Sequence, residues 1–406
     1  MPGTAYVVGT FDTKAEELRY VGALLRDAGL PVALVDIGTR SGEQDVTLTA
    51  AEVAAHHPDG ADAVLGGQDR GVAVNAMAEA LARCLPRRPD LGGIIGLGGS
   101  GGTVMVTKAM RALPIGVPKL MVSTLASGDV RPFVDVSDIA MMFPVTDIAG
   151  LNRISRVVLA NAAHALAGMM LRTAPAAVED KPSLGITMFG VTTPCVQQLT
   201  PLLSADYDCQ VFHATGTGGR AMEALVTAGL IRGVVDVSTT EVADLLMGGV
   251  CSAGPQRLDV LAAAPVPWVG SLGALDMVNF WAMNTVPEAF RHRRLHAHNA
   301  TVTLMRTSAE ECGRIGAWLA AKLNRAAGPV RLLIPEGGVS MLDAPGQPFH
   351  DPAADEALFT AVERDFRPGR DRRVQRYPLH INDPAFSAAV AEQVREAMSS
   401  SVLAVR

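Results

Sequence analysis

Several signatures that would assign a function directly are absent from this chain. No GxxxxGK[ST] sequence occurs, so a P-loop nucleotide-binding site is excluded. The five cysteines form no CxxC pair, and their odd number fits reduced thiols better than a disulfide framework. Aromatic residues make up 4% and the net charge is −6, which argues against a nucleic-acid-binding surface.

Targeting signals and membrane-length hydrophobic runs are also scarce. The N-terminal MPGTAYVVGTFDTK lacks the basic and apolar segments of a signal peptide. The longest apolar stretch, 157–171, contains Asn161 and His164 and is shorter than the roughly 20 residues that a span needs. We therefore expect a buried helix there, and a cytoplasmic protein that binds neither membrane nor nucleic acid.

The chain has ample material for a folded core. Of its 406 residues, 49% are hydrophobic and only 19% are charged. Short apolar runs end in Gly, Ser, Thr or Asp and then lead into helical patterns, as in TAYVVGTFDTKAEEL, GADAVLGG, LGGIIGLGGSGG and KLMVSTLASGD. Strands alternating with helices predict an α/β fold with mostly parallel, doubly wound sheets.

The composition changes near the middle of the chain. RTAPAAVEDKPS, rich in Pro, Ala and charge, follows a predicted helix at about 150–172 and reads as a linker. The strand–helix alternation then restarts, so we predict two subdomains, 1–175 and 176–406. GSGG at 99–102 and GTGG at 216–219 each open a helix, and FDTKAEEL parallels VTTPCVQQL. These parallels suggest an internal duplication.

A glycine-rich loop, GLGGSGGT at 96–103, is the strongest candidate for a binding site. It follows an apolar strand and opens a helix, so its backbone N–H groups can bind a phosphate or carboxylate. Its GxGxxG spacing also fits an NAD site, but the next strand ends in Ser123-Thr124 rather than an acidic residue. The predicted contacts are Gly98, Gly99, Ser100, Gly101, Gly102 and Thr103.

The loop after the first predicted strand carries a second set of polar residues. Thr10, Thr13 and Lys14 are donors at a helix start, and Asp12 is a candidate to hold Mg²⁺ through water. An equally simple alternative is that Asp12 or Thr13 only caps the helix. Asp36, at the end of the next strand, is placed to bind a ribose hydroxyl or to order a turn.

The second half holds candidates for acid–base chemistry. His213 precedes the second glycine loop, Asp276 and Asn279 follow a predicted strand, and Glu336 lies in a Gly/Pro-rich loop. Together with His298 they form our speculative catalytic set: His213, Asp276, His298 and Glu336. The His292, His296 and His298 spacing matches no standard zinc site. Whether the second glycine loop binds a ligand stays open at this point.

Taken together, the motifs resemble one family. They are GTFDTKAEEL, GLGGSGGT, MVSTLASGD, FPVTDIAGLNRIS, FHATGTGGRAMEAL, DVSTTEVAD, LMRTSAEE and IPEGGVSMLDAPGQPFHDP. The family is the Tm-one-like ATP-binding domain family, named for a plant tobamovirus-resistance protein. The resemblance covers essentially the whole chain.

This resemblance implies two Rossmann-like subdomains, ATP with Mg²⁺ in the first, and a homodimer. It adds Ser127 and Gly128 as neighbours of the nucleotide, and a separate barrel-type enzyme related to phosphoenolpyruvate-using enzymes as a partner. Three hypotheses follow. The first is an ATP-binding protein, which as an enzyme would use a small organic substrate. The second is a non-catalytic nucleotide-sensing module, and the third an NAD-dependent dehydrogenase.

Overall fold

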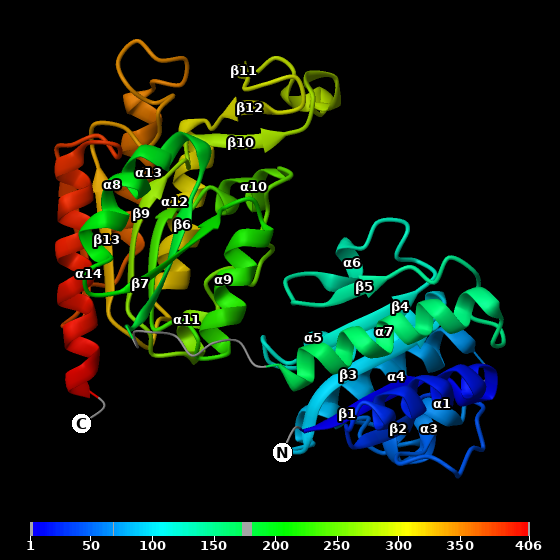
Figure 1. Ribbon diagram of the computed structural model, residues 1–406. Coiled ribbons are helices and arrows are strands. Elements are labelled where there is room, and N and C mark those ends of the chain that lie inside the picture. The colour runs from blue at the N-terminus through cyan, green and yellow to red at the C-terminus, as the bar shows by residue number, and fades with distance from the viewer. Residues whose placement is uncertain (1–2, 68, 173–180, 405–406) are drawn as a thin grey trace. The chain divides into compact units, whose positions relative to one another are not determined.

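The computed structural model describes residues 3–67, 69–172 and 181–404, and it divides into two compact units, Met1–Ala177 and Val178–Arg406. Each unit is an α/β fold whose main sheet is entirely parallel and carries helices on both faces (Figure 1). The predicted fold class is therefore confirmed.

The first unit contains a five-stranded sheet in the order β2-β1-β3-β4-β5. Its strands are β1 (Thr4–Gly9), β2 (Val32–Asp36), β3 (Leu91–Gly98), β4 (Lys119–Ser123) and β5 (Ala140–Met142). One face packs against α1 (Phe11–Asp27) and α7 (Arg153–Leu171), and the other against α4 (Arg70–Cys84) and α5 (Ser100–Arg111). Short helices α2 (Ala50–Ala54), α3 (Asp62–Leu65) and α6 (Arg131–Val134) and the 3-10 turn η1 (Leu85–Arg87) complete the unit.

The second unit contains a six-stranded sheet in the order β14-β13-β9-β8-β6-β7. Its strands are β6 (Ser183–Met188), β7 (Asp208–His213), β8 (Gly233–Ser238), β9 (Trp268–Gly273), β13 (Val330–Pro335) and β14 (Arg372–Tyr377). The helices are α8 (Thr193–Leu203), α9 (Thr217–Thr227), α10 (Glu241–Met247), α11 (Val260–Ala263), α12 (Ala309–Leu323), α13 (Pro352–Asp365) and α14 (Pro384–Ala404), with 3-10 turns η2 (Gly190–Thr192), η3 (Met283–Thr285) and η4 (Glu288–Phe290).

One prediction of local structure is wrong, and a second needs a refinement. GADAVLGG forms helix α3 rather than a strand, because Val64 is buried by a single helical turn packed on α4. Asn279 follows β9, as predicted, but it is part of a second strand. It lies within β10 (Met277–Phe280), which pairs with β12 (Thr303–Arg306) and through it with β11 (Leu295–Ala297) in a small antiparallel sheet.

Helix α7 corresponds to the apolar stretch that we predicted to be a buried helix. By length and composition it is long and apolar enough to cross a membrane, and it is the one such helix among the described residues. Its buried residues, including Leu159, Ala163 and Leu166, recur on one side and pack against the sheet of the first unit. The opposite side, which includes Val157, is exposed.

Candidate functional site

The strand order of the first unit identifies where a ligand would bind. The order reverses between β1 and β3, because β1 leads outward to β2 whereas β3 leads to β4 on the other side. Open α/β sheets bind ligands at this switch point, outside the carboxyl ends of the strands. The segments at those two strand ends are Thr10–Lys14, which runs into the first turn of α1, and Gly98–Thr103, which runs from the end of β3 into the first turn of α5. The structure therefore brings the two predicted loops to one place.

The glycine loop places the start of α5 directly at this edge. A Cβ on Gly98 would lie 2.9 Å from the Gly102 backbone, so glycine is needed for the tight turn. A Cβ on Gly99 or Gly101 would meet nothing closer than 3.8 Å, so these positions leave open space. Such space lets a ligand approach the backbone.

The N-terminus of α5 lacks the capping acceptor that the other long helices have. No side chain accepts a hydrogen bond at its N-cap Gly99, and no bond is found for the N–H groups of Ser100, Gly101 and Gly102 within the described parts of the chain. Every other described helix of eleven residues or more has a first-turn N–H bound by a side chain. The acceptors are Asp36 (α1), Asp69 (α4), Asn152 (α7), Asn382 (α8), Glu241 (α9), Ser308 (α12), Asp351 (α13) and Asp383 (α14).

Unbound N–H groups at a helix start attract anions, because they combine with the positive end of the helix dipole.

The two predicted hydroxyl donors of this loop, Thr103 and Ser100, differ in whether a ligand could contact them. Thr103 is fully buried and its hydroxyl donates to Gly99 O at 2.7 Å and contacts Ser123 Oγ at 2.6 Å. Ser100 is exposed. Thr103 therefore braces the loop, and Ser100 is free to contact a ligand.

Lys14, in the first turn of α1 after β1, lies at the same edge. Lys14 departs from helical geometry (φ −138°, ψ 24°), is half-buried, and has no side-chain partner among the described residues. Thr10 and Thr13 are hydrogen-bonded to each other through their hydroxyls at 2.7 Å, and Asp12 is exposed. Lys14 is thus a cation available to a bound anion.

Asp36 has a different environment from its neighbours. It is fully buried, and its Oδ1 accepts from Phe11 N at 3.1 Å and from Gly38 N at 2.8 Å. Its Oδ2 has no hydrogen-bond partner. A ribose hydroxyl would suit this oxygen, but the burial means that the covering loop would have to move. Ser127 and Gly128, the remaining predicted contacts, are exposed in the loop after β4.

The second glycine loop already contains an anion. Glu241 Oε1 accepts from Gly216 N at 2.8 Å and from Gly219 N at 3.1 Å. A Cβ on Gly219 would clash with the same carboxylate, so glycine is required for this contact. The side chain of Glu241 therefore occupies the position that a ligand phosphate would take.

Arg257 fixes that carboxylate in place. Its guanidinium bonds Glu241 at 2.8 Å, Glu223 at 2.7 Å and both oxygens of Asp236 at 2.8 and 2.9 Å. Burial alone would lower the pKa of Arg257, but these carboxylates outweigh it and hold the pKa well above the ordinary value. The network is a permanent internal ion cluster, which predicts a structural role for this loop.

The four speculative catalytic residues do not form one cluster. No hydrogen bond or ion pair joins any two of them within the described structure. His213 is exposed at the end of β7 and stacks on Phe189, with ring centroids 5.6 Å apart, whereas Glu336 pairs with Arg376 at 3.4 Å. His298 is exposed beyond β11. Only Asp276 is fully buried, so each residue has a separate setting.

Asp276 belongs to a buried acidic cluster around Arg306. Its Oδ2 accepts from Ser340 Oγ at 2.7 Å, while Arg306 bonds Asp355 at 2.6 Å. Burial raises the pKa of Asp276 to about 7, with Arg306 opposing and Asp343 adding to the shift. Burial likewise raises the pKa of Asp355 to about 8. The cluster therefore holds protons near neutral pH.

The raised pKa values of Asp276 and Asp355 predict that the free energy of unfolding falls as the pH rises. An unfolded carboxyl group loses its proton near pH 4, whereas the folded group keeps it to about pH 7–8, so the folded state binds more protons in between. We expect a loss of up to about 1.4 kcal/mol per pH unit for each such group from about pH 5 up to its folded pKa, about 7 for Asp276 and about 8 for Asp355. Asp355→Asn, which mimics the protonated acid, should flatten this slope in urea titrations of the second unit's transition. A slope equal to that of the wild type would contradict the assignment.

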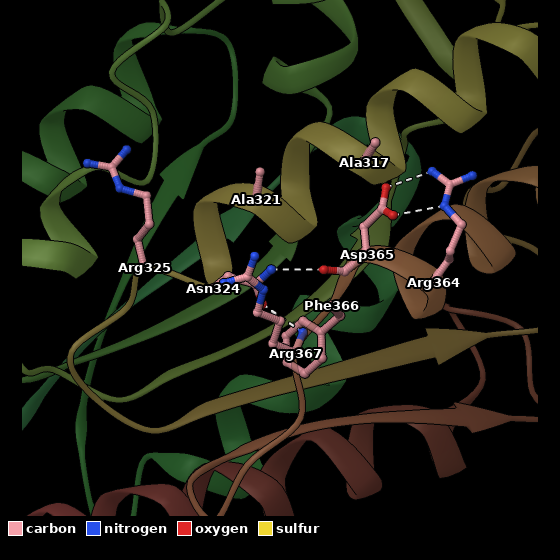
Figure 2. A pocket seen from close by; sticks show the side chains of 8 residues that line it. All are labelled: Ala317, Ala321, Asn324, Arg325, Arg364, Asp365, Phe366 and Arg367. Atoms are coloured by element: carbon pink, nitrogen blue, oxygen red, sulfur yellow. Dashed lines mark hydrogen bonds and ion pairs between the residues drawn. The ribbon is translucent and has the colours of Figure 1, made fainter.

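A hollow of about 600 Å³ on the second unit contains none of the predicted residues. It is lined by the ends of α12 and α13, including Arg325, Arg364 and Asp365 (Figure 2). Arg364 pairs with Asp365 at 2.6 Å, and Arg325 with Asp259 at 3.0 Å. Both helices end here, so the hollow lies away from the carboxyl edge of the sheet. No group of three or more potential metal-binding side chains occurs among the residues described.

Comparison with known proteins assigns the chain to a family. The N-terminal domain of the Uncharacterised protein family (UPF0261) matches residues 3–175, and its C-terminal domain matches residues 181–398. The chain belongs to the UPF0261 family. UPF0261 proteins of Mesorhizobium japonicum and Rhizobium meliloti are 58% and 57% identical, over 95% and 96% of this chain and 97% and 98% of theirs.

The UPF0261 chain is also related to a plant protein. The ToMV resistance protein Tm-1 of Solanum lycopersicum is 40% identical over 96% of this chain, which spans 55% of the tomato protein. The resemblance predicted from the motifs is therefore confirmed as homology to Tm-1. A dinucleotide-forming acetyl-coenzyme A synthetase of Ca. Korarchaeum cryptofilum matches 98% of this chain and 67% of its own with 9% identity and a TM-score of 0.22, too low to support an argument.

Proposed function

We propose that the first unit of this UPF0261 protein binds the phosphates of ATP at the N-terminus of α5. The observation that carries the proposal is the open helix start, because the other long helices have their first-turn N–H groups bound by a side chain. Backbone N–H groups of Ser100, Gly101 and Gly102 hold the phosphate, and the Ser100 hydroxyl adds a donor. This site lies at the switch point of the sheet, where such folds bind ligands.

The spacing of the strand ends and the positive charge of Lys14 support a triphosphate as the ligand. Neighbouring parallel strands are about 4.8 Å apart, so the ends of β3 and β2 are about 10 Å apart along the edge. An extended triphosphate can bridge this span, passing Lys14 and placing the nucleoside toward Asp36 and the β1 loop. Mg²⁺ would neutralise part of the phosphate charge, and Asp12, which is exposed, is the carboxylate placed to hold it through water.

The test measures binding directly. Calorimetry with Mg-ATP and with inorganic tripolyphosphate should show saturable binding of both, because the phosphates supply the main contacts. Mass spectrometry of small molecules released from the heat-denatured protein should recover ATP or ADP. Absence of heat with both ligands would refute the proposal, and recovery of a nicotinamide cofactor would favour the dehydrogenase hypothesis instead.

A further inference from the structure

Arg70 lies at the same edge of the sheet as the open helix start, although it is 30 residues away in sequence from Ser100. It is the first residue of α4, which ends near the beginning of β3, whereas α5 begins at the end of β3. Both helices therefore run from the carboxyl edge toward the amino edge. Because they pack against each other, their N-termini lie side by side.

One contact shows which residues of α4 and α5 lie at the same level along the two helices. A Cβ on Gly101 would lie 3.8 Å from Val74 Cγ2, so Val74 is level with the first turn of α5. Arg70 precedes Val74 by four residues, so it is on the same face of α4 and about 6 Å further toward the N-terminus. Long helical side chains also lean toward the N-terminus. The backbone of Arg70 is thus about one turn beyond the level of the α5 N-terminus, from where an arginine side chain can extend toward a ligand held there.

The charge of Arg70 has no partner among the residues that the structure describes. Its side chain is exposed and makes no hydrogen bond or ion pair with any described residue. The neighbouring Asp69 carboxylate is used to cap α4, accepting from Gly71 N at 2.7 Å and Val72 N at 3.0 Å. Lys14 approaches from α1 on the opposite face of the sheet. The two cations therefore come from helices on opposite faces of the sheet, both at its carboxyl edge.

We infer that Arg70 is a phosphate-binding residue that contacts the same phosphate as the α5 N–H groups. The inference rests on the proposed phosphate site and names a residue beyond the glycine loop. A guanidinium presents a rigid, planar pair of N–H donors that matches two phosphate oxygens, whereas an ammonium acts as a compact point charge. Arg70 then selects ligands that carry a phosphate group at this position.

The experiment compares three variants of the full chain by calorimetry with Mg-ATP, inorganic tripolyphosphate and adenosine. Arg70→Ala should weaken binding of both phosphate ligands by about tenfold or more, the effect of losing a charge-assisted hydrogen bond. Arg70→Lys should recover part of that loss, because it keeps the charge. Arg87→Ala removes the same charge from an exposed residue near the opposite end of α4 and should bind like the wild type.

The outcomes distinguish a failure of this inference from a failure of the proposed phosphate site at the α5 N-terminus. Wild-type affinity of Arg70→Ala for both phosphate ligands would overturn the role of Arg70 while leaving the α5 site in place. Equal losses in Arg70→Ala and Arg87→Ala would overturn it as well, because the effect would then be general electrostatics. No binding of either ligand by the wild type would refute the phosphate site and with it the inference.

Discussion

Gly101→Asp should abolish binding of ATP, with a loss of affinity of about a hundredfold or more. The space around Gly101 is open, so the new side chain fits without a clash. Its carboxylate then lies in the first turn of α5, where it satisfies the N–H groups and the helix dipole. The same charge repels a phosphate from the site. Binding is lost while the free energy of unfolding holds or rises, and calorimetry with thermal unfolding measures both.

Gly168→Asp is the matched control for this prediction. Gly168 is exposed on α7 and a Cβ there would meet nothing within 4 Å, so the variant makes the same chemical change on another helix of the same unit. It should bind ATP like the wild type. Unchanged binding in Gly101→Asp would show that the ligand, if any, is held elsewhere.

Arg257→Ala should destabilise the second unit by about 3–5 kcal/mol, the usual cost of leaving buried charges without their partner. The substitution leaves Asp236 and Glu241 buried without the cation that bonds them at 2.8–2.9 Å. For a unit of this size the midpoint of thermal unfolding should fall by about 6–20 °C. Differential scanning calorimetry of the full chain measures the change.

A surface arginine of the same unit supplies the comparison. Arg367 is exposed, and its side chain has no partner in the described structure, so Arg367→Ala should change stability by no more than about 0.5 kcal/mol. Similar midpoints for Arg257→Ala and the wild type would mean that the buried network contributes little beyond its own desolvation cost.

The sequence was sufficient to predict the parallel α/β fold and the loops at the carboxyl edge of the first sheet. Short apolar runs that end in Gly or Asp mark buried parallel strands, and that pattern is local. It could not reveal which helix starts are capped by distant side chains. Glu241 binds the N–H of Gly216 from 25 residues away and Asn382 binds that of Cys195 from 187 residues away. Such partners depend on the tertiary fold.

Arg70 was missed for a related reason. The sequence around Arg70, GGQDRG at 66–71, carries no specific motif, and the proposed phosphate contact depends on α4 and α5 starting at the same edge of the sheet. The four catalytic candidates were chosen by residue type, and the structure gives each a separate environment. Their roles, like those of the nucleotide contacts, stay predictions until binding and turnover are measured.

The suggested duplication requires an alignment of the two halves that does not pair the two glycine loops, 99–102 and 216–219. When the strands of each unit are numbered along the chain, both sheets run in the order second, first, third, fourth, fifth. In the second unit these strands are β7, β6, β8, β9 and β13. In this register the loops after β1 and β6 correspond, as FDTKAEEL and VTTPCVQQL suggested. The two glycine loops do not, because one follows the third strand of its sheet and the other follows the second. Their similarity therefore reflects the shared geometry of strand-to-helix turns.

The carboxylate of Glu241 also bears on stoichiometry. Counting glycine-rich loops in the chain suggests two ligands per polypeptide. Because the side chain of Glu241, from the start of α10, already occupies the second loop, only the first is left to bind a molecule from solution. A titration of the proposed nucleotide should therefore saturate at one equivalent per chain, and glycine content alone would overestimate the binding capacity of related sequences twofold.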